Sequence, residues 1–301
     1  MLEAFRSKVF RSTTQKTLGQ ATEIIAEYQE MDIGITLRQL YYRLVAKNLI
    51  KNKRNNYKRL SEILTDARYC GIVDWDAIVD RVRIPYRHSQ FKDIHELVDA
   101  AKNAYRLDRW ADQRYYVELA TEKDAIASLL QPIVDKYHIY LNVNRGYNSC
   151  TAMYDMGKRF LYHRNRGKLP VLLYLGDHDP SGLDMVRDID TRLKEFGSAV
   201  DVRAIALTLD QVSKYNLPPN YAKLNDSRSG WDKKTKTIRL GSYLDLYGWE
   251  SWEVDAIPPD ELVKMVESAI EECITDPDAI ESIKEQEKRD IERLTVLDGD
   301  N

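Results

Sequence analysis

The alternation of strand-like and helix-like segments between residues 113 and 208 restricts the fold more than any other feature of the sequence. Short apolar runs are typical of strands, and here they cover residues 113–120, 139–146, 170–177 and 200–208. Amphipathic segments typical of helices cover residues 121–137, 148–167 and 181–197. Parallel strands need long crossover connections, which are usually helices. The alternation therefore predicts an α/β domain with a mostly parallel sheet, right-handed crossovers and flanking helices.

The residues before this domain have the pattern of a helical DNA-binding unit. A helix is expected over residues 14–30, and Thr36 is placed to cap a second helix that runs to residue 50. A basic turn leads to a third helix, which Gly71 ends. Two helices joined by a short polar turn are typical of a helix-turn-helix, and the Arg-rich stretch that follows would form a wing. We therefore predict a winged-helix domain over residues 1–91.

The remaining boundaries follow from shifts in pattern. We expect a linker helix over residues 92–112, the α/β domain over residues 113–256 and C-terminal helices over residues 257–301. Thr121 is placed to cap the first helix of the α/β domain, with Asp124 completing a capping box. Residues 211–250 are rich in Lys, Asn, Asp and Gly, and their pattern predicts neither a regular element nor a function.

Acidic residues follow two of the predicted strands. In VLLYLGDHDPSG (171–182), Asp177 and Asp179 come directly after an apolar strand, and Glu122 follows the first strand. An α/β sheet binds its ligands at the carboxyl ends of its strands, so we expect these side chains to converge. Alternate residues of an extended segment point the same way, which puts both aspartates on one side. Clustered carboxylates without Cys or His select Mg²⁺ or Mn²⁺.

Several alternatives to this metal site stay open. Asp177 and Asp179 could form a solvated turn before a helix, since Pro180 and Gly182 are ordinary turn residues. Glu118 competes with Glu122 as the glutamate, but it lies in the middle of its strand. His178 should point away from the aspartates and is expected to be structural. Glu253 and Asp255 are remote candidates for supporting the metal.

The stretch TLRQLYYRLV contains a candidate nucleophile. Leu37, Leu40, Tyr41 and Leu44 recur at helical spacing and form the core face of the helix. Tyr42 lies off that stripe, one turn after Arg38. A tyrosine that leaves the core beside an arginine could attack a phosphate, although a phenol is a weak nucleophile without assistance. The alternative is a tyrosine packed at an interface.

Basic residues concentrate in the N-terminal part of the chain. Residues 1–110 contain 20 Lys and Arg against 14 Asp and Glu, whereas the remainder contains 25 against 34. Phosphate contacts are expected from a basic turn and helix. The candidate DNA-binding residues are Lys51, Lys53, Arg54, Lys58, Arg59 and Arg68, with Arg81, Arg83 and Arg87 extending the track. A solvated basic face without a ligand is the alternative.

The acidic residues resemble those of the Toprim domain shared by topoisomerases, DnaG-type primases and OLD-family nucleases. That family carries a Glu after its first strand and D-x-D after its third, which here correspond to Glu122, Asp177 and Asp179. An R-x-x-Y-Y helix in a winged helix, followed by Toprim, resembles the A subunit of type IIB topoisomerases (topoisomerase VI) and the related meiotic transesterases. The compact stand-alone forms called mini-A are the most similar, and the resemblance spans most of residues 20–270.

This resemblance implies a function and partners. Tyr42 would form a 5′-phosphotyrosyl link to double-stranded DNA, with Arg38 assisting and Mg²⁺ or Mn²⁺ held by Glu122, Asp177 and Asp179. In that family the tyrosine works with the metal of the other protomer, so a homodimer is implied. An unidentified ATPase subunit is a further candidate partner. Arg145 and Arg228 could assist, but the sequence assigns them no role.

Two other functions fit the same sequence. A Toprim nuclease would hydrolyse DNA with metal-activated water, leaving Tyr42 structural, and a winged-helix protein could bind DNA without catalysis. The widely spaced Cys70, Cys150 and Cys273 are typical of free thiols in a reducing compartment. The N-terminus lacks the apolar run of a signal peptide, and no stretch is apolar enough for a membrane span. We therefore expect a cytoplasmic, nucleoid-associated protein.

Overall fold

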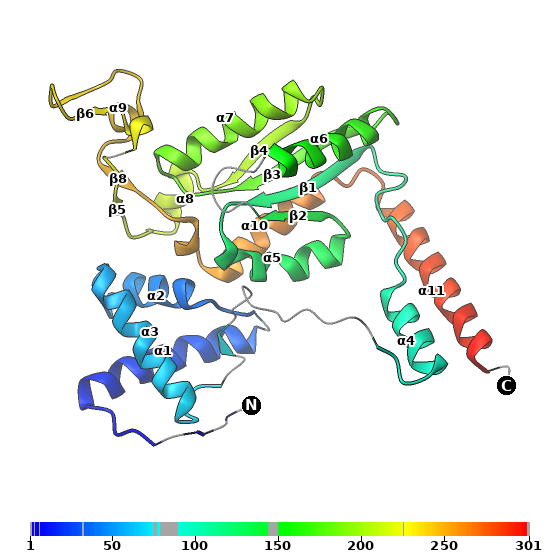
Figure 1. The fold of residues 1–301 in the computed structure, drawn as a ribbon, viewed down its shortest axis with the longest axis horizontal. Coiled ribbons are helices and arrows are strands. Elements are labelled where there is room, and N and C mark those ends of the chain that lie inside the picture. Colours follow the sequence, from blue (N-terminus) through cyan, green and yellow to red (C-terminus); the bar gives the residue numbers. More distant parts are fainter. Residues whose placement is uncertain are drawn as a thin grey trace.

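The arrangement of the chain is taken from a computed structural model. It describes residues 2, 4–5, 7–31, 33–74, 77–78, 90–143, 150–224 and 226–299. Three helices at the N-terminus lie below a sheet covered by helices, and two further helices stand at the side of the molecule (Figure 1). The N-terminal helices and one face of the sheet belong to a single hydrophobic core. The N-terminal helices therefore pack directly on the α/β domain.

The N-terminal part contains the helices expected from the sequence. They are α1 (Ser12–Glu30), α2 (Leu37–Ala46) and α3 (Arg54–Tyr69). Thr36 caps α2 in a capping box with Gln39, as its position in the sequence predicts. Leu40 and Leu44 are fully buried, which confirms the core face of α2. The expected wing falls largely on residues 79–89, outside the described residues, so the winged helix stays a prediction.

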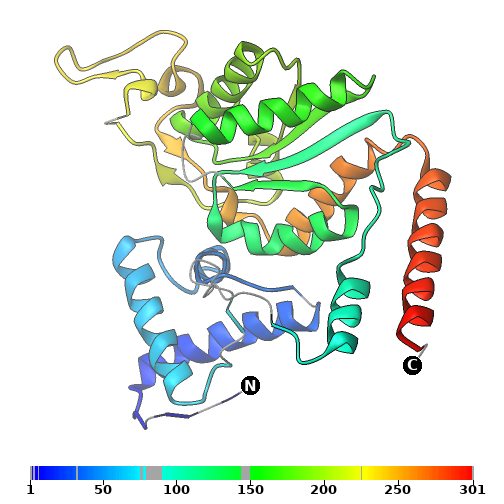
Figure 2. The ribbon, with the colours of Figure 1, turned by 45° about the vertical axis from the view of Figure 1, so that its right-hand side comes forward.

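The linker helix is shorter than predicted and pairs with the last helix. The linker helix, α4, spans Ile94–Ala104, and the last helix, α11, spans Pro277–Gly299 and lies beside α4 (Figure 2). The chain leaves the helix at Tyr105, whose hydroxyl bonds to Asp290 at 3.0 Å, and the Leu107 amide donates to Glu287 at 2.8 Å. α11 thus supplies hydrogen-bond partners to Tyr105 and Leu107, and residues 109–112 form turns instead of continuing the helix.

The predicted parallel sheet is confirmed. Its strands are β1 (Tyr115–Thr121), β2 (Tyr140–Val143), β3 (Leu169–Leu175) and β4 (Asp201–Ala206), in the order β2-β1-β3-β4 and all parallel. Nearly all of β1 and β3 is buried, as expected for strands covered on both faces. The flanking helices are α5 (Asp124–Tyr137), α6 (Cys150–Arg164), α7 (Pro180–Glu195) and α10 (Pro259–Glu271). α6 and α7 cover one face, while α5 and α10 cover the other.

Thr121 does not cap α5, contrary to prediction. It is the last residue of β1, and its hydroxyl accepts from the Lys123 amide at 3.2 Å. The helix begins at Asp124 without a side-chain cap, because the strand extends further than its apolar run suggests. Glu122 and Lys123 therefore lie between strand and helix, at the carboxyl edge of the sheet.

Residues 209–258, largely left without structure by the sequence pattern, form a small lobe of short elements. The helices and strands are α8 (Leu209–Lys214), β5 (Asn220–Tyr221), β6 (Trp231–Asp232), β7 (Thr237–Ile238), α9 (Tyr243–Tyr247) and β8 (Glu250–Ser251). Two short 3-10 helices complete the lobe, η2 (Ser227–Ser229) and η3 (Val254–Ala256). β5 pairs with β8, and β6 pairs with β7, in both cases antiparallel. The part of this lobe that carries β6 and α9 projects beyond β3 and α7 at the upper left of Figure 1. Strands of 2 residues each are too short to show a hydrophobic periodicity in the sequence.

Two features of the chain bear on its surroundings. None of the helices formed by described residues combines the length and apolar character that crossing a bilayer requires. Cys70 and Cys273 are free thiols, as expected, and the side chain of Cys150 lies outside the described part of the chain.

Candidate metal centre and its cavity

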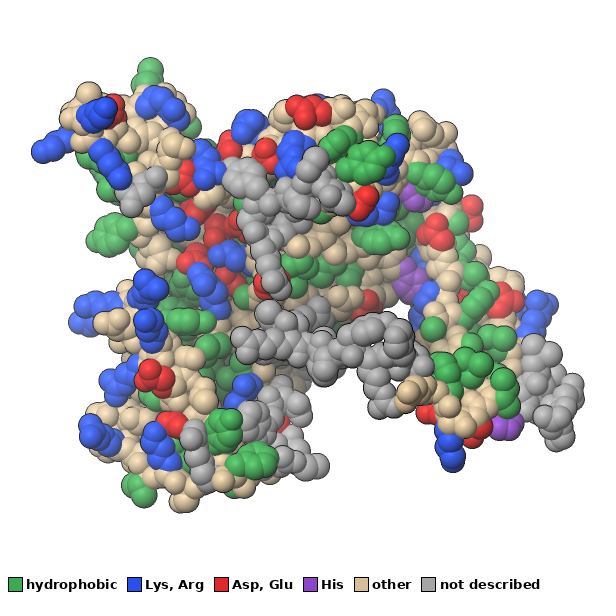
Figure 3. Space-filling model, in the orientation of Figure 1, with side chains coloured by type: hydrophobic (Ala, Val, Ile, Leu, Met, Phe, Trp, Pro, Cys, Tyr) green, Lys and Arg blue, Asp and Glu red, His purple; other side chains and the backbone are tan. Residues whose placement is uncertain are grey.

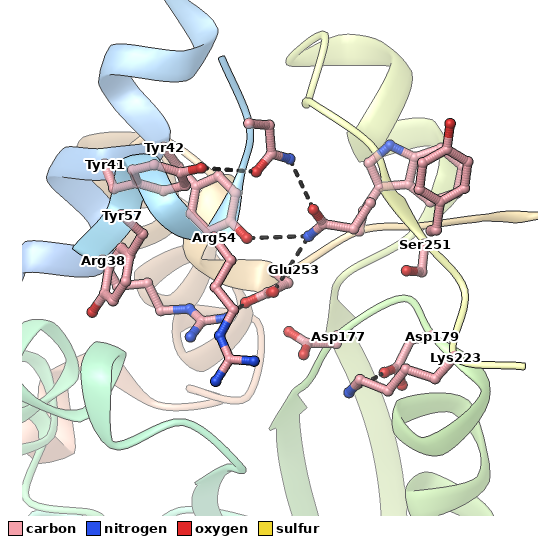
Figure 4. Close-up of a pocket in the computed structure, with 14 residues that line it drawn as sticks. Arg38, Tyr41, Tyr42, Arg54, Tyr57, Asp177, Asp179, Lys223, Ser251 and Glu253 are labelled. Carbon is pink, nitrogen blue, oxygen red and sulfur yellow. Dashed lines mark hydrogen bonds and ion pairs between the residues drawn. The ribbon is translucent and has the colours of Figure 1, made fainter. Parts of the chain in front are cut away.

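A cavity of about 370 Å³ lies where the N-terminal helices meet the carboxyl edge of the sheet. In the space-filling view it appears as a hollow with acidic side chains inside and basic side chains on its rims (Figure 3). Tyrosines and arginines of α2 and α3 line one wall, and residues of the 209–258 lobe line the other (Figure 4). Asp177 and Asp179 form part of its floor. Residues from three distant parts of the sequence therefore share one solvent-accessible space.

The sheet brings Glu122 and Asp177 together as predicted. β1 and β3 are neighbours with Thr121 paired to Leu175, so the residues that follow both strands meet. The Asp177 amide donates to Glu122 Oε1 at 3.1 Å. A Cβ on Gly182 would lie 2.1 Å from the Asp177 carbonyl oxygen, so the first turn of α7 can approach Asp177 this closely only with glycine there.

A backbone bridge brings a second acidic segment to the same place. His178 and Trp252 exchange two backbone hydrogen bonds of 2.9 and 3.0 Å. The bridge places Glu253, Val254 and Asp255 beside β3, and the Val254 amide donates to Asp177 Oδ1 at 3.0 Å. A segment more than 70 residues away in sequence thereby supplies two more carboxylates.

Asp177, Glu253 and Asp255 form an acidic triad. Oxygens from each of these carboxylates lie within 4.8 Å of one another. The Asp255 side chain is fully buried, and neither of its oxygens has a hydrogen-bond partner among the described residues. Burying a carboxylate without hydrogen bonds is costly unless a cation compensates it. The triad could therefore bind a metal ion, and its oxygen donors fit a hard cation.

The triad overlaps only partly with the predicted ligands. Asp177 belongs to both sets, and Glu122 touches Asp177 through its backbone. Asp179 lines the cavity, but its carboxylate caps α7, accepting from the Gly182 amide at 2.7 Å, with Lys223 at 3.5 Å. Glu253 and Asp255, which the sequence offered only as remote candidates, belong to the triad. The feature of the sequence that could have identified them is their i, i+2 spacing, which is the same as that of Asp177 and Asp179.

Two basic side chains lie among the carboxylates. Lys123 Nζ is 2.6 Å from Asp177, 3.3 Å from Glu253 and 3.5 Å from Asp255. Arg38 pairs with Glu253, and its Nε lies 3.1 Å from Asp255. Lys123 directly follows Glu122 in the sequence, but the sequence pattern assigned it no role. Arg38, which the resemblance implies would assist Tyr42, contacts the triad.

The protonation equilibria indicate an excess of negative charge. The pKa of Asp177 is raised to about 7, chiefly by burial; Lys123 opposes this shift, and the charges of Glu122 and Asp255 add to it. Burial lowers the pKa of Lys123, but Asp177 and Asp255 outweigh burial and leave it raised. Both shifts favour an additional positive charge, which is the condition under which a cation binds.

Tyr42 faces the triad through Asn220. Asn220 Nδ2 donates to the Tyr42 hydroxyl at 3.1 Å and also lies 3.3 Å from Glu253 Oε1. The Tyr41 hydroxyl instead accepts from the Lys53 amide at 2.8 Å. The prediction that Tyr42 leaves the core was wrong: both tyrosines are 4% exposed, because the 209–258 lobe covers Tyr42. Burial raises the Tyr42 pKa, and Asn220 and Arg38 lower it by less.

Glu118, the competing glutamate, serves a separate structural role. It is fully buried in β1, and Arg159 donates to both of its oxygens at 2.8 Å. Tyr116 and Asn142 add hydrogen bonds of 2.8 Å each. His178 is also structural, as predicted, since its ring packs against Tyr243 and its Nδ1 lies 3.1 Å from that hydroxyl.

The predicted DNA-binding residues separate into two groups. Lys51, Lys53, Arg54, Lys58 and Arg59 are exposed, and Arg54 also lines the cavity. Arg68 differs from them, because it is only partly exposed and donates to the Ile78 carbonyl at 2.7 Å. Arg228 pairs with Asp226 at 2.6 Å. Arg81, Arg83, Arg87 and Arg145 lie outside the described residues.

These features were compared with known proteins. Comparisons with protein-family models, with curated proteins and with solved structures found no significant match to this chain.

Proposed function

We propose that this protein is a metal-dependent DNA-cleaving transesterase similar to topoisomerase VI A subunits. One observation supports this most: the Tyr42 hydroxyl and Glu253 of the triad share the side-chain amide of Asn220, at 3.1 and 3.3 Å. A candidate nucleophile and a candidate metal ligand thus open onto one cavity with basic rims. A phosphodiester in that cavity would meet both at once.

The proposed reaction is an in-line phosphoryl transfer. The Tyr42 oxygen attacks the backbone phosphorus and loses its proton to solvent, and the 3′ oxygen leaves as a hydroxyl after taking a proton. Arg54 and Arg38 line the cavity and would bind phosphate oxygens and orient them toward Tyr42. Asp177, Glu253 and Asp255, with Glu122 beside them, would hold Mg²⁺ or Mn²⁺, which neutralises charge on the phosphate and the leaving oxygen.

Tyr42 lies beside the triad of its own chain. The resemblance implies instead that the tyrosine works with the partner protomer's metal. The contact through Asn220 supports cleavage by residues of one chain, with a homodimer then cutting both strands. Light scattering of the purified protein measures whether the dimer forms.

A Toprim-like nuclease is the second candidate. Burial raises the pKa of Tyr42, which makes its phenol a poorer nucleophile and favours attack by metal-activated water instead. In that reaction Tyr42 would only close the cavity, and the products would carry no protein.

A cleavage assay with two tyrosine variants distinguishes these functions. Supercoiled DNA is incubated with protein and Mg²⁺ or Mn²⁺, quenched with detergent and examined for protein linked to 5′ ends. Adducts that disappear in Tyr42→Phe but persist in Tyr41→Phe support the transesterase. Free ends made equally well by Tyr42→Phe support the nuclease. DNA binding without cutting by any of the proteins would contradict both enzymes and favour a non-catalytic DNA-binding protein.

A further inference from the structure

The β6–β7 hairpin in the 209–258 lobe concentrates exposed positive charge. Lys233, Lys234, Lys236 and Arg239 lie on the hairpin or directly after it, and all are exposed. Asp232 is the single acidic residue among them, and its carboxylate is engaged in the turn. It accepts from the Lys234 amide at 2.8 Å and the Thr235 amide at 3.3 Å. The lysines are therefore presented to solvent on a turn with a defined shape.

The hairpin is held firmly at its base. The Arg239 amide donates to the Gly230 carbonyl at 2.8 Å, and Trp231 packs edge-on against Trp249 with ring centroids 5.4 Å apart. Gly230 has a φ of +86°, and a Cβ there would lie 2.0 Å from Ser242 Oγ. Only glycine allows this close approach without rearrangement. The base is thus built to hold the basic turn in one orientation.

The hairpin and α3 stand on opposite sides of the cavity. Both project to the left in Figure 1, the hairpin above and the start of α3 below. Figure 3 shows basic side chains on both projections and acidic ones in the hollow between them. Lys223, whose side chain is 74% exposed, lies on the cavity wall between hairpin and floor.

We propose that the β6–β7 hairpin binds the phosphate backbone of the DNA duplex whose cleaved strand enters the cavity. The inference rests on the proposed function for the identity of the partner. The acidic triad repels DNA, so a duplex can approach it only if cations on both sides outweigh that repulsion. Lysines act as point charges toward phosphate without reading sequence. The hairpin thus provides the second of two contacts, α3 being the first.

A salt titration of DNA binding tests this inference. The hairpin variant combines Lys233→Gln, Lys234→Gln and Lys236→Asn, asparagine being chosen because position 236 has a φ of +55°. A matched control combines Lys158→Gln, Lys284→Gln and Lys288→Gln on α6 and α11. Binding to a fluorescent duplex of about 30 base pairs is measured by anisotropy with EDTA present, so that cleavage does not contribute.

The expected result is a smaller salt dependence for the hairpin variant alone. Each lost phosphate contact lowers the slope of log K against log salt by about 0.9, so three contacts lower it by up to about 3. The affinity at low salt should fall by about tenfold or more, with the control unchanged.

Other outcomes would overturn the inference in distinguishable ways. If the hairpin variant keeps the wild-type slope while Lys58→Gln with Arg59→Gln lowers it, the hairpin inference is wrong and the proposed function stands. If wild-type protein binds no duplex, both are wrong. Binding to anionic lipid vesicles in place of DNA, lost in the hairpin variant, would also overturn the inference by identifying a membrane surface as its partner.

Discussion

Two buried groups of carboxylates lie on or next to β1, and they differ in how well nearby cations balance their negative charge. The Glu118 cluster (Glu118, Arg159, Tyr116 and Asn142) lies within the strand, and the acidic triad (Asp177, Glu253 and Asp255) lies beyond its carboxyl end. In the Glu118 cluster, Arg159 matches the charge and both oxygens accept hydrogen bonds. The cluster is closed, so no ligand is needed to complete it.

The acidic triad is unbalanced and open. Together with Glu122, its carboxylates outnumber the cations of Lys123 and Arg38, and Asp255 has no hydrogen bond among the described residues. The pKa of Arg159 is raised by its hydrogen bonds to Glu118, as expected for a well-matched ion pair. In the triad, the pKa of Asp177 is raised to about 7, mainly by burial. The comparison teaches that charge balance and access, more than burial, separate a structural carboxylate from a candidate ligand.

The largest expected effect is on protein stability, and it concerns the Glu118 cluster. Arg159→Ala leaves Glu118 buried without its ion-pair partner, which should lower the free energy of unfolding by about 3–5 kcal/mol. Asp177→Asn should change it far less, because Lys123 keeps Glu253 and Asp255 as partners. Urea denaturation of both variants measures the difference. Equal losses in the two variants would contradict the distinction.

The second prediction concerns ligand binding by the triad. Asp255→Asn keeps the shape of the side chain but removes a carboxylate, so Mn²⁺ affinity should fall by at least about 10-fold. Its stability should fall by less than that of Arg159→Ala, because Arg38 and Lys123 lose one ion-pair partner but keep Glu253. Mn²⁺ titration followed by electron paramagnetic resonance measures the affinity. Glu285→Gln on α11 is the control, and unchanged Mn²⁺ binding in Asp255→Asn would show that the triad is not the site.

A smaller effect is expected from Lys123. Its ammonium group lies where a metal ion would share the same oxygens, so the two cations should compete. Lys123→Met should therefore tighten Mn²⁺ binding by about tenfold, while Lys123→Arg should not. The same resonance titration measures both variants. Weaker binding in Lys123→Met would mean that the lysine organises the carboxylates instead of competing for them.

The smallest expected effect is a pH dependence. Asp177 has a pKa raised to about 7, so below that pH it retains a proton that a metal ion must displace. Mn²⁺ affinity should accordingly rise as pH increases from about 6 to about 7.5, by about eightfold for a single proton. The Mn²⁺ titration repeated across this range measures it. Asp177→Asn should show weaker binding with a flatter profile, and an equally steep profile would assign the proton to another group.

Much of the α/β domain could be predicted because its signals are local. The apolar runs of β1 and β3 and the amphipathic helices between them each depend on near neighbours, and parallel register then places Glu122 beside Asp177. Boundaries were less accurate where long-range partners intervened. Thr121 stayed in its strand, and the helix after residue 92 ended at Ala104 where α11 offers other hydrogen bonds.

The sequence by itself determined the order of elements, the parallel sheet and the acidic residues after β1 and β3, because hydrophobic periodicity and strand direction are encoded over short stretches. Only the tertiary structure decided that Glu253 and Asp255 join Asp177, that Lys123 lies among them and that Asn220 links Tyr42 to the triad. Those contacts depend on the backbone bridge between His178 and Trp252 and on the packing of the 209–258 lobe against α2. Such long-range docking is set by the shape and charge of whole surfaces, which no local pattern records.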